Sequence, residues 1–270
     1  MTRLIKKLGA TYQLDDNYSV YAGYGEGFKM PTSQQLFVSA QAIGTTSFVD
    51  VIPNPDLQPE SVASWEAGLR GEFGNGYFSV GGFYAKYDNF IRSLQPVEGL
   101  EDTFTYDNVE RVELWGIEAS AEYEAMENVF LHGALSWSQG VQQVDSGSSE
   151  TVFDGAVPLT VVAGLRYEMP EQGLEFELIG TFGAGVTERS DPDAFKPDGY
   201  AVFDAYAKWQ PTETIELTAG IQNIFDTRYF PNTLSGYGNT PDSSASAAVN
   251  PLELQVAPGR TFKLGASMKF

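Results

Sequence analysis

The sequence predicts an all-β protein, an antiparallel transmembrane β-barrel segment of about eleven strands. Segments of about ten residues alternate apolar and polar side chains, as strands with two different faces do. Tight turns alternate with long loops along the chain, so one end of the sheet carries only turns and the other only long loops. Aromatic residues gather near strand ends. These three features together are typical of a membrane-spanning barrel.

The tight turns and the long loops divide the chain into regular segments. The turns are Asp15-Asp16-Asn17, Gly74-Asn75-Gly76, Met126-Glu127-Asn128, Pro170-Glu171-Gln172-Gly173 and Gln210-Pro211-Thr212-Glu213. The long loops lie near 29–59, 93–110, 140–157, 187–197 and 226–258. Between them we expect strands near 4–14, 18–28, 60–73, 77–92, 111–124, 128–139, 158–168, 174–185, 199–209, 214–224 and 260–270.

Alternation assigns two faces to most of these strands, because successive side chains of a strand point to opposite sides. The expected apolar face carries Trp65, Ala67, Leu69 and Phe73, then Trp115, Ile117, Ala119, Ala121 and Tyr123, then Ile215, Leu217, Ala219 and Ile221, then Phe262, Leu264, Ala266, Met268 and Phe270. The opposite face is strongly charged in several strands. Strand 77–92 has aromatic residues on both faces, so its faces stay unassigned.

The four tryptophans occupy the apolar face near strand ends. Trp65, Trp115 and Trp137 lie beside long loops, and Trp209 lies beside a turn. Aromatic girdles at the two membrane interfaces account for these positions. A soluble β-sandwich is the alternative, but its core would also place tryptophans in the middle of strands. We therefore expect the tryptophans and Phe270 to point outward and to be solvent-exposed in the absence of lipid.

An odd strand number predicts a fragment. Single-chain bacterial barrels have even strand counts. A chain that ends at Phe270 on the turn side and has eleven strands begins on the loop side, so half of the barrel is expected to be missing. Taken alone, the chain could bring its edge strands, 4–14 and 260–270, together into a small closed barrel. Residues 1–7 have neither an apolar core nor a cleavage site, so they do not form a signal peptide.

Composition narrows the possible partners. The net charge of −20 argues against nucleic acid as a partner and suits a polar lumen with acidic loops. There is no cysteine, which rules out disulfides and thiolate metal sites. No apolar run reaches the roughly 18 residues of a membrane helix, but a barrel strand needs only every second residue to be apolar.

Five segments, in order, resemble those of TonB-dependent outer-membrane receptors. They are Gly27-Phe28-Lys29-Met30-Pro31, Asn54-Pro55-Asp56-Leu57-Gln58-Pro59-Glu60, Gly116-Ile117-Glu118, Ile221-Gln222-Asn223-Ile224-Phe225-Asp226-Thr227-Arg228-Tyr229, and Gly259-Arg260-Thr261-Phe262 through Phe270. The resemblance covers essentially the whole chain. It implies the C-terminal half, 1–270, of a 22-stranded barrel in the outer membrane of a Gram-negative cell, with the N-terminal plug domain absent.

The resemblance also implies partners. The complete receptor would import an iron complex with energy from the TonB complex, which it would contact only through the missing plug. Phe270 resembles the terminal signal read by the barrel assembly machinery, and outer-membrane lipid would surround the wall. The segments around Gly27 and Gln34-Gln35-Leu36-Phe37 lean toward the haem/haemoglobin branch. That branch places a haem-binding histidine between the first two boxes, whereas residues 32–53 contain neither histidine nor tyrosine. A ferric-siderophore cargo therefore stays open.

Three residues are weak ligand candidates. His132, the only histidine, alternates with Val129, Leu131 and Leu135 and should face the lumen, where a hydrogen-bonded lining role is favoured over ligand binding. Met30 and Tyr237 lie in long loops and could touch an iron porphyrin, although loop packing is the simpler role. We expect no catalytic, cofactor or metal site in the protein itself.

Three functions compete on this basis. A receptor for TonB-dependent uptake, most simply of haem, agrees with all five segments. An outer-membrane enzyme would need a base beside a nucleophile or an activated water, and the sequence has no cysteine and no cluster around its single histidine. A passive porin-like channel would need a complete, even-stranded barrel.

Overall fold

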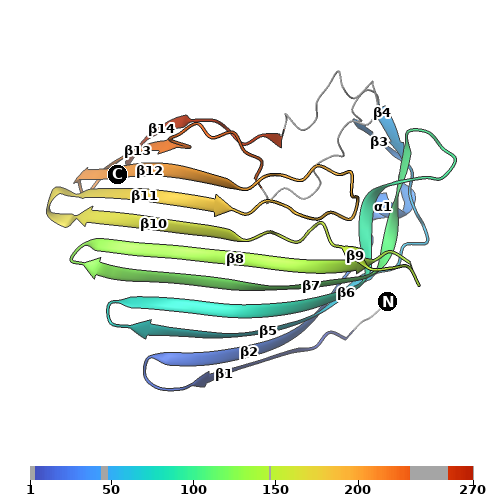
Figure 1. Ribbon diagram of the computed structural model, residues 1–270, viewed down its shortest axis with the longest axis horizontal. Helices are drawn as coiled ribbons and strands as arrows, with labels where there is room; N and C mark the ends of the chain where they lie inside the picture. Colours follow the sequence, from blue (N-terminus) through green and yellow to red (C-terminus); the bar gives the residue numbers. More distant parts are fainter. Residues whose placement is uncertain (1–3, 44–47, 146, 232–254, 270) are drawn as a thin grey trace.

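The computed structural model describes residues 4–43, 48–145, 147–231 and 255–269. Eleven strands follow one another across a single antiparallel sheet, in the order β1-β2-β5-β6-β7-β8-β10-β11-β12-β13-β14 (Figure 1). They are β1 (Lys7–Gln13), β2 (Tyr18–Lys29), β5 (Glu60–Phe73), β6 (Gly76–Pro96), β7 (Thr103–Met126), β8 (Val129–Gln143), β10 (Thr160–Met169), β11 (Leu174–Gly183), β12 (Tyr200–Thr212), β13 (Ile215–Gln222) and β14 (Thr261–Met268). The eleven expected strands are confirmed.

Short elements fold the long connections. They are α1 (Ser33–Phe37), β3 (Ala40–Ile43), β4 (Phe48–Val51), β9 (Thr151–Val152) and the 3-10 turn η1 (Pro170–Gln172). Helix α1 starts at a capping box: the Thr32 hydroxyl accepts the Gln35 backbone N–H at 3.2 Å, and the Gln35 side chain accepts the Thr32 N–H at 2.8 Å. None of the described helices is long and apolar enough to cross a membrane, a result that does not bear on β-barrels.

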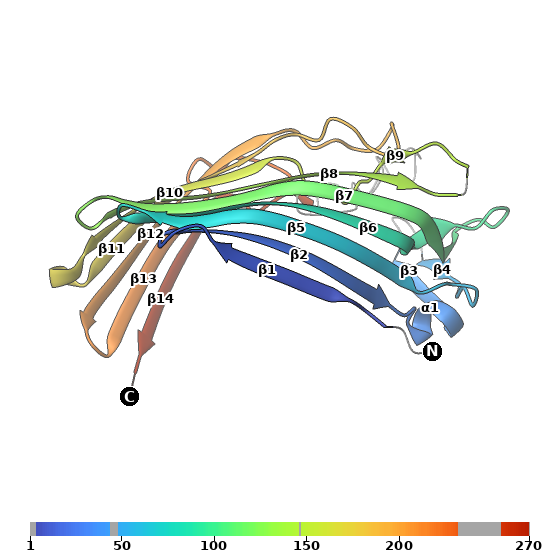
Figure 2. The ribbon, with the colours of Figure 1, turned by 90° about the horizontal axis from the view of Figure 1, so that it is seen from below.

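The sheet curves into an open arch (Figure 2). The tight turns lie at one end and the long connections at the other, as expected. Among the described residues, β1 pairs only with β2 and β14 only with β13. The small closed barrel considered from the sequence is therefore not formed, and both edges of the arch are open.

The strand register fixes one apolar, outward face. Side chains directly opposite one another on this face include Leu131 with Tyr123 and Leu165, Tyr167 with Phe176, Trp209 with Leu217, and Ile221 with Phe262. Most of these side chains are exposed. Large exposed apolar faces are rare on soluble monomers, so this face requires a non-aqueous environment. The sandwich alternative is wrong, because the strands of the described residues all belong to one sheet.

Two aromatic rows cross the outward face. Tyr24, Trp65, Tyr84 and Trp115 are successive cross-strand partners toward the loop end. Toward the turn end, Tyr18, Phe73, Phe78 and Tyr123 contact one another, with Phe73 and Tyr123 stacked at 5.7 Å. On β7 the rows are eight positions apart, about 26 Å along the strand at ~3.3 Å per residue. A strand tilt of about 40° reduces this to ~20 Å, close to the apolar band of membrane barrels.

The exposure expected of the tryptophans is only partly correct. Trp65 and Trp209 are exposed, at 44% and 46%, whereas Trp115 and Trp137 are half-buried. They remain on the outward face, but the long connections after β9 and β11 pack near them. Phe270 lies outside the described residues. On β6, whose faces the sequence left unassigned, Tyr84 and Val80 point outward, while Phe83 and Tyr77 point into the arch.

Candidate functional site

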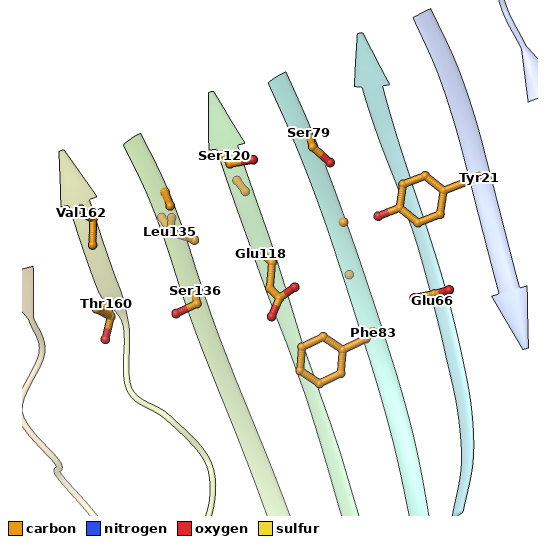
Figure 3. A pocket seen from close by; sticks show the side chains of 14 residues that line it. Tyr21, Glu66, Ser79, Phe83, Glu118, Ser120, Leu135, Ser136, Thr160 and Val162 are labelled. Atoms are coloured by element: carbon orange, nitrogen blue, oxygen red, sulfur yellow. The ribbon is translucent and has the colours of Figure 1, made fainter. Parts of the chain in front are cut away.

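A shallow hollow of about 610 Å³ lies on the concave face of the arch, across strands β2 to β10. Its lining includes the aromatic rings of Tyr21 and Phe83, the carboxylates of Glu66 and Glu118, and several serine and threonine hydroxyls (Figure 3). We call this hollow the lumenal groove. It opens to the space that the arch surrounds, so its side chains face whatever fills that space.

Strand alternation places the groove residues on the concave side. Glu66 follows the outward Trp65 on β5 and lies directly opposite Phe83 on β6. Glu118 follows the outward Ile117 on β7 and lies opposite Gly81. Glu66 and Glu118, 52 positions apart in the sequence, thereby lie on the same side of the sheet, on strands separated only by β6.

Glycines let Tyr21 lie flat on the wall. A Cβ atom at Gly68 would stand 2.5 Å from the Tyr21 ring, and one at Gly81 would stand 2.5 Å from its hydroxyl oxygen. Real side chains do not tolerate such distances. The two glycines therefore allow the ring to cross β5 and reach β6, which leaves the groove shallow and open.

The groove is acidic. No hydrogen bond or ion pair joins the carboxylates of Glu66 and Glu118 to any other described residue, and both residues are exposed. Along β5 and β7 the inward positions include Glu60, Glu66, Glu72, Glu118, Glu122 and Glu124, as well as the basic residue Arg70. Exposed carboxylates beside aromatic rings suit a cationic group, either a lysine ammonium or an arginine guanidinium.

His132 faces the concave side, as predicted, and reaches across a neighbouring strand. Its cross-strand partners are Glu122 on β7 and Gly164 on β10. The ring occupies the space above Gly164, where a Cβ atom would lie 2.1 Å from Nε2. Nε2 lies 2.9 Å from the Glu177 carboxylate on β11, off the line of a well-formed N–H hydrogen bond. His132 is thus engaged with the wall rather than directed into open space.

The surroundings of His132 are paired charges. Arg166 lies 3.3 Å from Glu122 and 2.9 Å from Glu168, and its guanidinium stacks 4.5 Å from the centre of the Phe130 ring. This arrangement supports the lining role for His132. Within the described part of the chain, no group of three or more His, Asp or Glu side chains could hold a metal ion.

The loop between the first two sequence boxes is anchored to the wall. Asn54 donates its backbone N–H to the Gln35 carbonyl at 2.8 Å and its Nδ2 to the Tyr106 carbonyl at 2.9 Å. Gln58 donates its backbone N–H to the Asn108 side chain at 2.8 Å. Strand β4 also pairs in parallel with the start of β7. The second box therefore fastens the mouth loop to the β6–β7 hairpin.

Of the two loop candidates, Met30 and Tyr237, the structure describes only Met30. Met30 follows β2 and is half-exposed, at 50%. Tyr237 lies outside the described residues. Their roles as ligand contacts stay predictions.

The fourth and fifth sequence boxes form a structural hub at the loop end. Asn223 is 3% exposed and has a left-handed backbone, with φ of 51°. Its Nδ2 donates to the carbonyls of Thr227 and Pro258, at 2.8 and 3.3 Å, and its Oδ1 accepts the Thr227 N–H at 2.7 Å. Asp226 accepts the Arg260 N–H at 2.7 Å. These hydrogen bonds connect the end of β13 to the segment that leads into β14.

Tyr200 and Tyr229 lie beside this hub, with their tilted rings in contact and the ring centres 4.4 Å apart. Burial, followed by the nearby carboxylate of Asp204, raises the pKa of Tyr229. The Tyr229 phenol therefore stays neutral at physiological pH.

Comparison with known proteins identifies the family. The family model described as "TonB dependent receptor-like, beta-barrel" matches residues 2–224. The chain belongs to the TonB-dependent receptor family. This is a family of transport receptors of the outer membrane, and the resemblance seen in the sequence is confirmed.

Relatives and solved structures agree with this assignment. The chain is 24% identical, over 97% of its length, to a probable haemoglobin and haemoglobin-haptoglobin-binding protein of Haemophilus influenzae, and 23% identical over 88% to the ferripyoverdine receptor of Pseudomonas aeruginosa. It covers 29% of each of these relatives. The copper transporter OprC shares the fold over 98% of the chain, with a TM-score of 0.78, 20% identity and 39% of that chain covered. The ferric enterobactin receptor of Pseudomonas aeruginosa does so with a TM-score of 0.73, 18% identity and 40% covered.

Proposed function

We propose that this chain is the C-terminal half of the wall of a 22-stranded outer-membrane receptor that takes up an iron complex, with haem as the favoured cargo. The observation that best supports this proposal is the open, eleven-strand arch with a lipid-facing exterior and a charged interior. It spans about a third of its relatives' length, so a further wall segment and a plug domain would complete the receptor. No catalytic role is proposed.

The choice of haem draws on the relatives. Several are named as haemoglobin-binding proteins or a haemin receptor. A ferric siderophore is the second candidate, because another relative is a ferripyoverdine receptor and residues 32–53 lack a haem-ligating histidine or tyrosine. A porin-like channel is the third, and it is disfavoured because the matching family model and the relatives named above are receptors.

The lumenal groove gives the proposal a specific partner. A plug domain inside the barrel would meet Glu66 and Glu118 directly, and basic side chains on its surface would complement them. The connection to the TonB complex would run through this plug. The wall itself contributes a fixed acidic contact that holds the plug in place.

Growth measurements test the cargo. The full-length receptor, expressed in an iron-starved strain that lacks other receptors, should restore growth on haem. If the receptor restores growth only on a ferric siderophore, the cargo is the siderophore and not haem. A steady open-channel conductance of the purified protein in lipid bilayers would favour the porin.

Charge reversal tests the plug contact. The double variant Glu66→Lys and Glu118→Lys should loosen the plug and admit large antibiotics that the outer membrane normally excludes. Glu72→Lys, an inward change outside the groove, serves as the control. If both variants leak equally, or neither leaks, the groove does not hold the plug.

A further inference from the structure

The loop end of the wall carries a small side sheet. Strand β3 pairs with β4 in antiparallel register, and β4 pairs in parallel with the start of β7 (Figure 1). A hollow of about 460 Å³ lies against this side sheet, lined by residues in and next to β3, β4 and the tip of the β6–β7 hairpin. We call β3, β4 and the hairpin tip, residues 97–102, the outer platform.

Backbone hydrogen bonds fix the outer platform to the wall. The backbone N–H of Asp50 donates to the Asp102 carbonyl at 3.0 Å, and that of Ile52 donates to the Phe104 carbonyl at 2.8 Å. Val51, between them, is 4% exposed. A partner therefore meets a preformed surface, which reduces the conformational entropy lost on binding.

The outer edge of β3 is open. Among the described residues, β3 pairs only with β4. An open edge presents backbone N–H and carbonyl groups, beside which another extended chain can add as a strand. Proteins commonly protect such edges with charged side chains or proline. The four residues of β3, Ala40–Ile43, include neither, so the edge is available for pairing.

The surroundings of this edge are uniformly acidic. Residues 30–58 and 93–110 contain no lysine, arginine or histidine. Four exposed acidic residues belong to the outer platform: Asp50, Glu98, Glu101 and Asp102. Coulombic attraction therefore favours a cationic partner, and repulsion between like charges disfavours a second copy of this chain.

Exposed apolar side chains lie next to the same edge. Phe37 and Val38, which lead into β3, are 70% and 50% exposed, and Leu100 of the hairpin tip is 55% exposed. Leu100 lines the hollow together with Ala40. Alternate side chains of an added strand point to one face, so apolar residues at every second position can reach this surface while basic residues between them stay near the carboxylates.

We propose that the outer platform binds an extended, cationic segment of a protein partner as an additional strand beside β3. Backbone hydrogen bonds to the open edge supply affinity, and the carboxylates and the hollow select the sequence. Long loops of outer-membrane barrels are extracellular, so the partner approaches from outside the cell. The binding uses no residue of the lumenal groove and does not depend on the cargo, so it is separate from the proposed function.

Peptide binding to the full-length receptor in lipid nanodiscs tests the proposal. The probe is a fluorescent decapeptide of alternating lysine and valine, followed by fluorescence anisotropy with empty nanodiscs as the blank. It should bind with a micromolar Kd, whereas a decapeptide of alternating glutamate and valine should not bind. Two further probes carry methyl groups on the backbone nitrogens of either the lysines or the valines. Because alternate N–H groups of a strand point to the same edge, only one of these two probes should lose affinity, by about tenfold or more.

Charge reversal locates the binding site. Glu98→Lys combined with Glu101→Lys should weaken binding of the cationic probe about tenfold or more. Glu127→Lys combined with Glu171→Lys changes the total charge equally at the turn end of the wall, and this control should bind as the parent does. The methylated probes need no receptor variant, so they keep the test decisive if the first double variant does not fold.

Four results would overturn the proposal. They are equal affinities of the two methylated probes, binding of the acidic peptide, equal weakening by the two double variants, and self-association of the receptor that the cationic probe blocks. The last result would make a second copy of the receptor the occupant of the edge.

Discussion

Leu135 offers a direct test of the membrane-facing side of the wall. It points outward on β8, opposite Ala119, which lies midway between the aromatic rows at Trp115 and Tyr123. Half of the ~20 Å between the rows puts Leu135 about 10 Å from each interface. Leu135→Arg therefore places a charge near the bilayer midplane, at a cost of about 2–4 kcal/mol. The equilibrium constant for folding should decrease roughly 30- to 700-fold.

The neighbouring residue supplies the control. Ala134 points inward on the same strand and lines the acidic groove, so Ala134→Arg should change stability by less than about 0.5 kcal/mol. Urea titration of the full-length receptor in lipid vesicles, followed by gel mobility of the folded form, measures both variants. If Leu135→Arg is as stable as Ala134→Arg, the assignment of the outward face to lipid is refuted.

Three further predictions concern single side chains of the full-length receptor. His132→Ala should leave growth on haem nearly unchanged, because His132 contacts Glu177 of the wall. Deleting residues 32–53 should abolish growth on haem. Loss of growth in a normally expressed His132→Ala receptor would contradict this prediction. Asn223→Ala should lower the free energy of local unfolding by about 2–3 kcal/mol, since it removes the buried hydrogen bonds of the hub. Proteolysis between β13 and β14 should therefore become faster. Asn75→Ala, in an exposed turn, should not change the rate of proteolysis. The raised pKa of Tyr229 predicts that stabilisation of its loop is complete below about pH 10 and is lost as the pH rises through the higher folded value. Protease sensitivity against pH would show this, and a Tyr229→Phe variant with the same pH dependence would disprove it.

The sequence predicted the strands well because alternation and turn chemistry are local. Strand 60–73 was placed at its observed bounds, and the turn that follows it uses the left-handed backbone of Gly74, with φ of 53°. The faces of β6 could not be assigned. Phe83 is a large ring on the concave side, accommodated because it lies against Gly116 of the next strand. That contact depends on register, which alternation within one strand does not reveal.

The functional surfaces were harder to predict. Glu66 and Glu118 were recognisable as inward-facing, but their place in one groove depends on the pairing of β5, β6 and β7. The short elements within the long loops were missed as well. The Thr32 to Gln35 spacing was an available signal for α1, since it is the pattern of a capping box. The concave-facing position of His132 was predictable because its strand alternates clearly, although its reach to Glu177 across Gly164 was not.

Uptake of radioactive iron supplied as haem tests the central claim most directly. Cells that express the full-length receptor should accumulate the label when the TonB complex is intact and lose that accumulation when it is deleted. The same cells should regain uptake when the TonB complex is restored. Accumulation that continues without the TonB complex, at a rate proportional to the external haem concentration, would identify passive flux and contradict the account.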